Sequence, residues 1–178
     1  MRAWRLFALQ PGSGMLLAPQ VGSPQIAAHL PHRAKPWASR AMWATCLIDP
    51  EHEPPAADCF CGVYACPERA SLARIATTAA PARVVADVFL GGRITPDPAA
   101  WTTGVEGLRA AWGIVLSLEI ECPPNPPVPE WIRQRPDILP TVQRKLAERR
   151  AWWRDREQIA GRLRDRYGVP VTFGKVVD

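Results

Sequence analysis

Most of the residues that could do chemistry lie in one short window. Cys46, His52, Cys59 and Cys61 fall within sixteen residues of one another, and Cys66 follows shortly after. Thiolates and imidazole nitrogens are the ligands that zinc prefers, and three cysteines with one histidine make a closed, tetrahedral shell of the structural kind. We therefore expect Cys46, His52, Cys59 and Cys61 to hold one structural zinc ion. The window predicts a metal site but no reaction.

The residues between these ligands favour a loop that folds back on itself. Turn-forming residues, including Pro54 and Pro55, fill the interval. Four acids lie close enough in sequence to accept the second imidazole proton or to support the ligands: Asp49, Glu51, Glu53 and Asp58. One feature is atypical, because a single residue separates Cys59 from Cys61, whereas paired zinc cysteines usually have two or more residues between them.

The alternative is that these cysteines are small buried hydrophobic residues and that His52 is solvated. Cys66 is the spare thiol, either part of the core or reactive near the start of a helix. Cys122 precedes a proline-rich run and is expected to be structural.

The sequence gives no positive case for an enzyme. The segment around Cys59 and Cys61 resembles cysteine-peptidase nucleophile segments, but those families place the histidine base after the cysteine. Here His29, His32 and His52 all precede both cysteines. The chain also contains no Gly-x-Ser-x-Gly elbow, phosphate-binding glycine-rich loop or His-Glu-x-x-His helix.

Length and composition predict a folded protein that is neither secreted nor in a membrane. The 178 residues are 47% hydrophobic and include eight tryptophans, whereas twenty prolines indicate many turns and extended connections. No apolar run reaches the length of a membrane span, and the N-terminal apolar stretch ends too early for a signal peptide. Five cysteines, an odd number, fit reduced thiols in the cytoplasm.

The patterning predicts an α+β fold: a small, mainly antiparallel sheet with a loop organised by the Cys/His cluster, one medium helix and one long C-terminal helix. We expect strands at 2–9, 15–17, 41–48 and 83–90, the last ended by Gly91 and Gly92, and a helix at 67–80. Residues 104–122 suit a short helical turn or coil followed by a strand. The expected organisation is a core at 1–122 with the zinc loop at 46–61, a proline-rich spacer at 123–130, and a basic helix with a short tail at 131–178, docked on the core.

The C-terminal helix is expected to run without interruption over 139–167, between Pro140 and Gly168. A tail strand at 169–177 should add to one sheet edge. One face of the helix carries the apolar residues Val142, Leu146, Trp153, Ala160 and Leu163.

The same segment concentrates positive charge. Residues 131–167 contain eleven Arg or Lys against five Asp or Glu. Arg144, Arg150, Arg154 and Arg162 are expected to face away from the apolar stripe, where they could lie along the phosphates of DNA or RNA, with Trp152 stacked on a base. The alternative is a solvated face with local ion pairs, and a helix stripe that packs on the core, on a protein partner or in a homodimer.

The spacing of Cys46, His52, Cys59 and Cys61, followed by Gly62, Tyr64 and Ala65, resembles a motif of small uncharacterised proteins from actinobacteria and their phages. Three further stretches fit the same group: Arg2–Arg5, Val84–Gly92, and the run from Gly104 to Arg109 and Ala110. The resemblance covers residues 1–122 and implies no activity.

Together, these features predict a small zinc-stabilised accessory protein that contacts nucleic acid through its basic helix. The alternative is a protein-interaction module of phage or mobile-element type that binds no nucleic acid.

Overall fold

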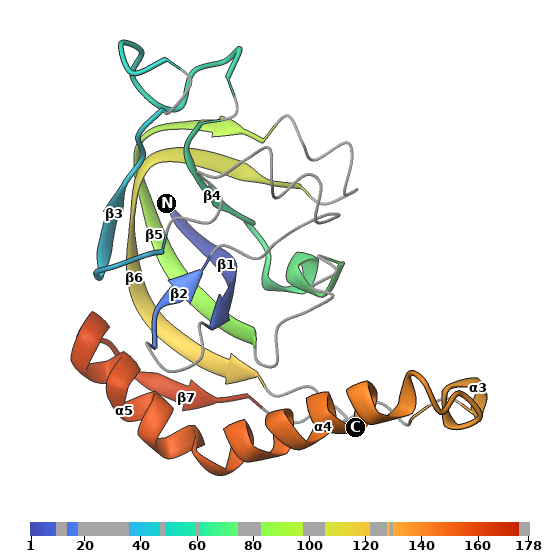
Figure 1. The fold of residues 1–178 in the computed structure, drawn as a ribbon. Coiled ribbons are helices and arrows are strands. Elements are labelled where there is room, and N and C mark those ends of the chain that lie inside the picture. Colours follow the sequence, from blue (N-terminus) through green and yellow to red (C-terminus); the bar gives the residue numbers. More distant parts are fainter. Residues whose placement is uncertain are drawn as a thin grey trace.

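A computed structural model describes residues 1–9, 14–17, 36–46, 49–59, 61–74, 83–97, 106–121, 128 and 130–174. One curved sheet forms the body of the protein in the described residues, and the C-terminal helices run beside it (Figure 1). The strands are β1 (Arg2–Leu9), β2 (Leu16–Leu17), β3 (Ala41–Trp43), β4 (Val63–Ala65), β5 (Arg83–Pro96), β6 (Leu108–Glu121) and β7 (Val171–Phe173). The helices are the 3-10 helix η2 (Arg69–Arg74) and the α-helices α3 (Glu130–Arg133), α4 (Leu139–Arg154) and α5 (Arg156–Tyr167).

Strand β6 is the centre of the sheet. One edge pairs with β5 in antiparallel fashion along its whole length, and β5 continues to β1 and then β2. The other edge of β6 carries three short strands in turn: β4 at its start, β3 at its middle and β7 near its end. Because β7 runs parallel to β6, the sheet is mixed.

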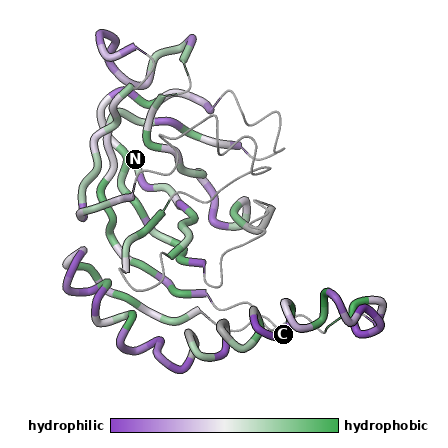
Figure 2. The backbone as a smooth tube through the Cα atoms, viewed as in Figure 1, coloured by the Kyte–Doolittle hydropathy of each residue, from purple (hydrophilic) through white to green (hydrophobic). Residues whose placement is uncertain are grey.

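The sheet curves until its far edges meet. Trp4 and Cys66 exchange two backbone hydrogen bonds of 2.7 Å, which connect the chain just after β4 to the free edge of β1. Leu16 and Trp37 form a second isolated bridge. The concave side holds the core, to which every strand except β3 contributes fully buried or nearly buried apolar side chains. Figure 2 shows this distribution, with mostly hydrophobic strands and largely hydrophilic C-terminal helices.

The predicted α+β fold with a long C-terminal helix is wrong, since the protein is built mainly from the seven-stranded mixed sheet in the part that is described. The glycine pair Gly91–Gly92 does not end β5 as expected. Gly92 has φ 71°, and the register with β6 shifts between Gly91 and Ile94. A bulge built on glycine lets the strand bend and continue, so β5 and β6 each reach fourteen residues.

The C-terminal helix is also not continuous, because it is divided at Asp155 into α4 and α5. Asp155 occupies the N-cap position of α5, where aspartate is favoured over a helix interior, although its side chain makes no capping hydrogen bond here. The two helices have different surroundings. Helix α5 buries Ile159, Ala160, Leu163 and Tyr167, whereas Val142 and Leu146 of α4 are only half-buried. The side chains of Trp152 and Trp153 lie outside the described residues.

Several other expectations are confirmed or shortened. Strand β1 has its predicted bounds, and β2 and β7 occur where a returning strand and a tail strand were expected. The strand expected at 41–48 ends at Trp43, and the helix expected at 67–80 is described only as η2. Residues 75–80, 98–105 and 122–127 lie outside the described residues. No helix in the described part of the chain is long and apolar enough to cross a membrane.

Candidate metal centre

The Cys/His window forms a loop that leaves the sheet and returns to it at adjoining positions. The amide of Ala44 donates to the carbonyl of Ala111 at 2.8 Å, and Val63 pairs with Ala110, the next residue along β6. Strands β3 and β4 are therefore two halves of one antiparallel edge strand, interrupted by residues 45–62. Cys46 and Cys61 lie at the base of this loop, and both are buried.

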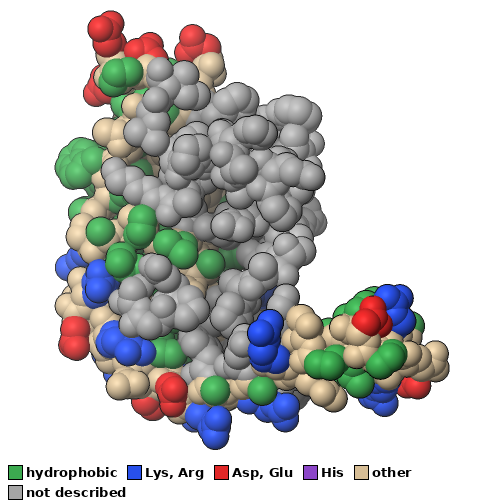
Figure 3. All heavy atoms as spheres, viewed as in Figure 1, with side chains coloured by type: hydrophobic (Ala, Val, Ile, Leu, Met, Phe, Trp, Pro, Cys, Tyr) green, Lys and Arg blue, Asp and Glu red, His purple; other side chains and the backbone are tan. Residues whose placement is uncertain are grey.

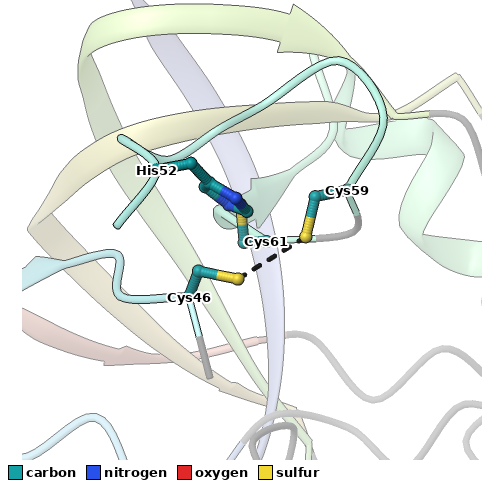
Figure 4. A group of neighbouring side chains, drawn as sticks. All are labelled: Cys46, His52, Cys59 and Cys61. Carbon is teal, nitrogen blue, oxygen red and sulfur yellow. Dashed lines mark hydrogen bonds between the residues drawn. The ribbon is translucent and has the colours of Figure 1, made fainter. Parts of the chain in front are cut away.

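The four predicted ligands converge at this base (Figure 4). Their candidate ligand atoms all lie within 4.8 Å of one another. The Cys46 and Cys59 sulfurs are 3.6 Å apart, and His52 Nε2 lies 3.1 Å from the Cys61 sulfur. A disulfide needs sulfurs at about 2.05 Å, and all four of the cysteines Cys46, Cys59, Cys61 and Cys66 are free. The side chains of Cys46, His52, Cys59 and Cys61 therefore lie close enough to hold a metal ion.

The spacing of these atoms fits a four-coordinate ion. With zinc–sulfur bonds of about 2.3 Å, tetrahedral geometry places ligand atoms about 3.8 Å from one another. The Cys46–Cys59 separation of 3.6 Å is close to this value, and the widest separation of 4.8 Å is greater by about one ångström. Small side-chain rotations therefore suffice to form the shell. Four protein ligands would leave no position for a reacting water.

Asp49 supports two of the ligands. Its carboxylate lies 3.4 Å from Nδ1 of His52, in position to accept the proton of that nitrogen and leave Nε2 free to bind metal. Its backbone amide donates to the Cys46 sulfur at 3.3 Å. The carboxylate also accepts the amide of Glu51 at 3.0 Å, which tightens the turn. All four of the predicted acids are exposed, and Asp49 is the one that shows such contacts among the described residues.

Arg109, on β6, holds the other side of the loop. Its side chain is only 2% exposed, and Nη1 donates to the carbonyls of Ala56 and Cys61, both at 3.2 Å, and to that of Cys59. Among the described residues no carboxylate forms an ion pair with Arg109. Three thiolates, a divalent ion and a neutral histidine carry a net charge of −1, so a metal-bound centre would supply the anionic neighbour that this buried cation lacks.

Gly62 explains how the loop comes so close to Arg109. Its φ of 135° suits glycine, and an added Cβ would lie 2.9 Å from Cβ of Arg109 and 3.4 Å from Cβ of Pro55. Sequence reasoning did not identify Arg109 as part of the site. The available signal was a single arginine between apolar residues at the start of a strand.

The surroundings of Cys59 favour its protonated thiol. Burial is the main cause that raises the pKa of Cys59, and its contacts with the sulfurs of Cys46 and Cys61 raise it further, against a lowering by a backbone hydrogen bond at Cys61. Coordination requires thiolates, so metal binding at this centre would release protons.

The other predicted site residues do not join this centre. Cys66 is buried at the bridge to Trp4, where burial raises the pKa of its thiol. Arg144, Arg150 and Arg154 are exposed on α4, whereas Arg162 is half-buried on α5. The expected row of four arginines is therefore divided between two helices. His29, His32 and Cys122 lie outside the described residues.

Comparison of the chain with protein-family models, with curated proteins and with solved structures gives no match.

Proposed function

We propose that this chain is a zinc-stabilised binding protein, in which one structural zinc closes the base of the loop at 45–62. The observation that carries the proposal is the convergence of Cys46, His52, Cys59 and Cys61 to within 4.8 Å. Zinc is the preferred ion for three thiolates and one imidazole in a tetrahedral arrangement. Because this shell is complete without water, the ion would stabilise the fold and would not activate a substrate.

Metal analysis of the purified protein tests this proposal. We expect about one zinc per chain in the parent protein, and a large loss of zinc in the variants Cys59→Ser and Cys61→Ser. Cys66→Ser is the matched control, because Cys66 is also buried and free but lies outside the cluster. A parent protein without bound metal that also fails to bind added zinc would refute the proposal, as would equal zinc loss in the Cys66→Ser variant.

For the binding role, we propose contact with nucleic acid through α4. The supporting observation is that Arg144, Arg150 and Arg154 are exposed on a helix whose described side chains are nowhere fully buried. Figure 3 shows basic and acidic side chains together along the C-terminal helices, with an excess of basic ones in the sequence of this segment, whereas the loop at 45–62 at the other end of the view shows acidic side chains. The net positive charge of the C-terminal segment would attract an anionic polymer towards the helices.

A salt titration against DNA and RNA tests this role. Phosphate contacts release counterions, so affinity should fall steeply as salt increases. Reversal of Arg144, Arg150 and Arg154 to glutamate should abolish binding at moderate salt without unfolding the protein. If the parent protein binds no nucleic acid even at low salt, the protein-interaction role of phage or mobile-element type replaces this one.

A further inference from the structure

A cluster of three aromatic side chains lies on the convex face of the sheet, outside the core. It consists of Trp43 on β3, Phe89 on β5 and Trp112 on β6, which we call the aromatic platform. Trp43 is 68% exposed and Phe89 is 43% exposed. The centroid of the Trp112 ring lies 5.7 Å from that of Trp43 and 6.0 Å from that of Phe89. A contiguous group of exposed aromatic side chains, unlike a single one, is typical of an interaction site.

Strand register explains why the rings share one face. Trp43 pairs directly with Trp112, and Trp112 pairs with Gly91. Phe89 is two residues before Gly91 and therefore points to the same side. The intervening residues Leu90 and Met42 point the other way, into the core or against it.

The backbone beneath the platform is shaped to receive Trp112. A Cβ at Gly91 would lie 2.0 Å from the Trp112 ring, so only glycine allows the indole to lie flat against β5. Gly92 continues this floor, since its Cβ would lie 3.3 Å from Nε1 of Trp112. Trp112 is thus fixed as the inner member of the platform, and Trp43 and Phe89 are left exposed on either side of it.

Three arginines belong to, or directly flank, the strands that carry the platform. Arg2 pairs across the sheet with Phe89, Arg40 immediately precedes β3, and Arg93 follows Gly92. All three are exposed. Arg2 is bonded to Asp87. Arg40 Nε donates to the carbonyl of Val115 at 3.2 Å, and neither Arg40 nor Arg93 forms an ion pair within the described part of the chain. The surface therefore combines stacking faces with uncompensated cations.

We propose that the aromatic platform binds single-stranded nucleic acid, with bases stacked on Trp43 and Phe89 and phosphates near Arg40 and Arg93. Aromatic faces flanked by cations are the features that bind single strands without sequence preference. A second copy of the chain is a poor occupant, because face-to-face packing would bring arginine against arginine in a protein of net charge +5. The inference extends the proposed nucleic-acid binding to a site on the sheet that is separate from α4.

Fluorescence anisotropy with labelled oligothymidylate and oligouridylate, at about 50 mM salt, tests the proposal. We expect Trp43→Ala and Phe89→Ala each to weaken binding by roughly 5- to 100-fold, because each variant removes one ring on which a base can stack. Trp43→Phe should restore most of the affinity. Trp131→Ala is the matched control, because Trp131 is 61% exposed but lies on α3. A duplex should bind more weakly than either single strand, since its bases are already stacked.

The outcomes separate this site from α4. Weaker binding by Trp43→Ala and Phe89→Ala, with Trp131→Ala unchanged and folding intact by circular dichroism, supports the platform. If only the triple reversal of Arg144, Arg150 and Arg154 lowers affinity, the platform is refuted and the proposed function stands. Absence of binding to any oligonucleotide refutes both. Concentration-dependent self-association that Trp43→Ala abolishes, without oligonucleotide binding, would refute the platform in favour of a second copy.

Discussion

Ala44 and Val63 are neighbours along β6, although residues 45–62 separate them in the sequence. Ala44 bonds to Ala111 and Val63 pairs with Ala110, so the two residues behave as consecutive members of one edge strand. Everything between them is an excursion whose two ends meet. Cys46 and Cys61 lie just inside those ends, which means that a metal ion bound there would close the loop at its narrowest point.

Removal of metal should therefore loosen the loop before it affects the sheet. We expect a chelator to abolish hydrogen-exchange protection of the amides of Asp49 and Cys59, while the amides that join β5 to β6 remain protected. The reason is that closure of the loop base depends on the metal, whereas the long ladder of β5 and β6 does not. Exchange followed by mass spectrometry, with and without chelator, checks this. Equal protection in both samples would contradict it.

Arg109→Met should destabilise the protein, and more strongly with zinc bound than without it. The variant loses donors to three loop carbonyls, which costs about 1–3 kcal/mol when acceptors are left unsatisfied. In the zinc-bound protein it also removes the positive charge beside a centre of net charge −1. Urea unfolding of both proteins, with and without zinc, measures the difference. Arg109→Lys should recover part of it. Equal destabilisation in the two states would show that Arg109 acts only on the loop backbone.

The metal loop was predictable because its signal is local. Cys46, His52, Cys59 and Cys61 are chemically distinctive and close in sequence, so their convergence required only a loop that turns back. The role of Arg109 was not predictable, because Arg109 is far from the loop in sequence. It also binds backbone carbonyls, which every residue type has, so its partners cannot be recognised from their residue types.

The errors in the fold prediction also arise where contacts between residues far apart in sequence outweigh the local sequence signal. Gly91 and Gly92 indicate a strand end when only neighbouring residues are considered. They continue the strand here because Trp112, from another strand, fills the space above them. Asp155 was only a weak signal for a helix end within a helical pattern. The helix is divided there at the point where α4, which has no buried side chain among those described, gives way to α5, which packs on the core.

Gly91→Ala should be strongly destabilising, whereas Gly161→Ala should be neutral or stabilising. A methyl group at Gly91 would overlap the Trp112 ring, but nothing lies within 4 Å of a Cβ at Gly161. Alanine in the interior of a helix is favoured over glycine by about 0.5–1 kcal/mol. Thermal unfolding of the two variants compares them directly. Similar stability of both variants would mean that Trp112 does not lie against Gly91.

Tyr167→Phe should remove a polar connection between α5 and two segments of the N-terminal half. The Tyr167 hydroxyl accepts the amide of Leu16 at 3.0 Å and donates to the carbonyl of Trp37 at 2.6 Å, and the side chain is 1% exposed. Loss of both bonds leaves a buried donor and acceptor unsatisfied, so we expect a loss of about 1–3 kcal/mol in unfolding free energy at neutral pH.

The stabilisation from Tyr167 should also depend on pH, with a defined sign. Burial raises the pKa of the Tyr167 hydroxyl, against a smaller lowering by the hydrogen bond from Leu16. The stabilisation by the Tyr167 hydroxyl is complete below its unfolded-state pKa of about 10, and it is lost as the pH rises through the higher folded-state pKa. The reason is that, between these two pKa values, the unfolded chain releases the hydroxyl proton whereas the folded protein retains it. The stability difference between the parent and Tyr167→Phe should therefore shrink above pH ~10. Denaturant unfolding of both proteins between neutral and strongly alkaline pH measures it, and a difference that stays constant or grows would show that the hydroxyl is not buried between Leu16 and Trp37.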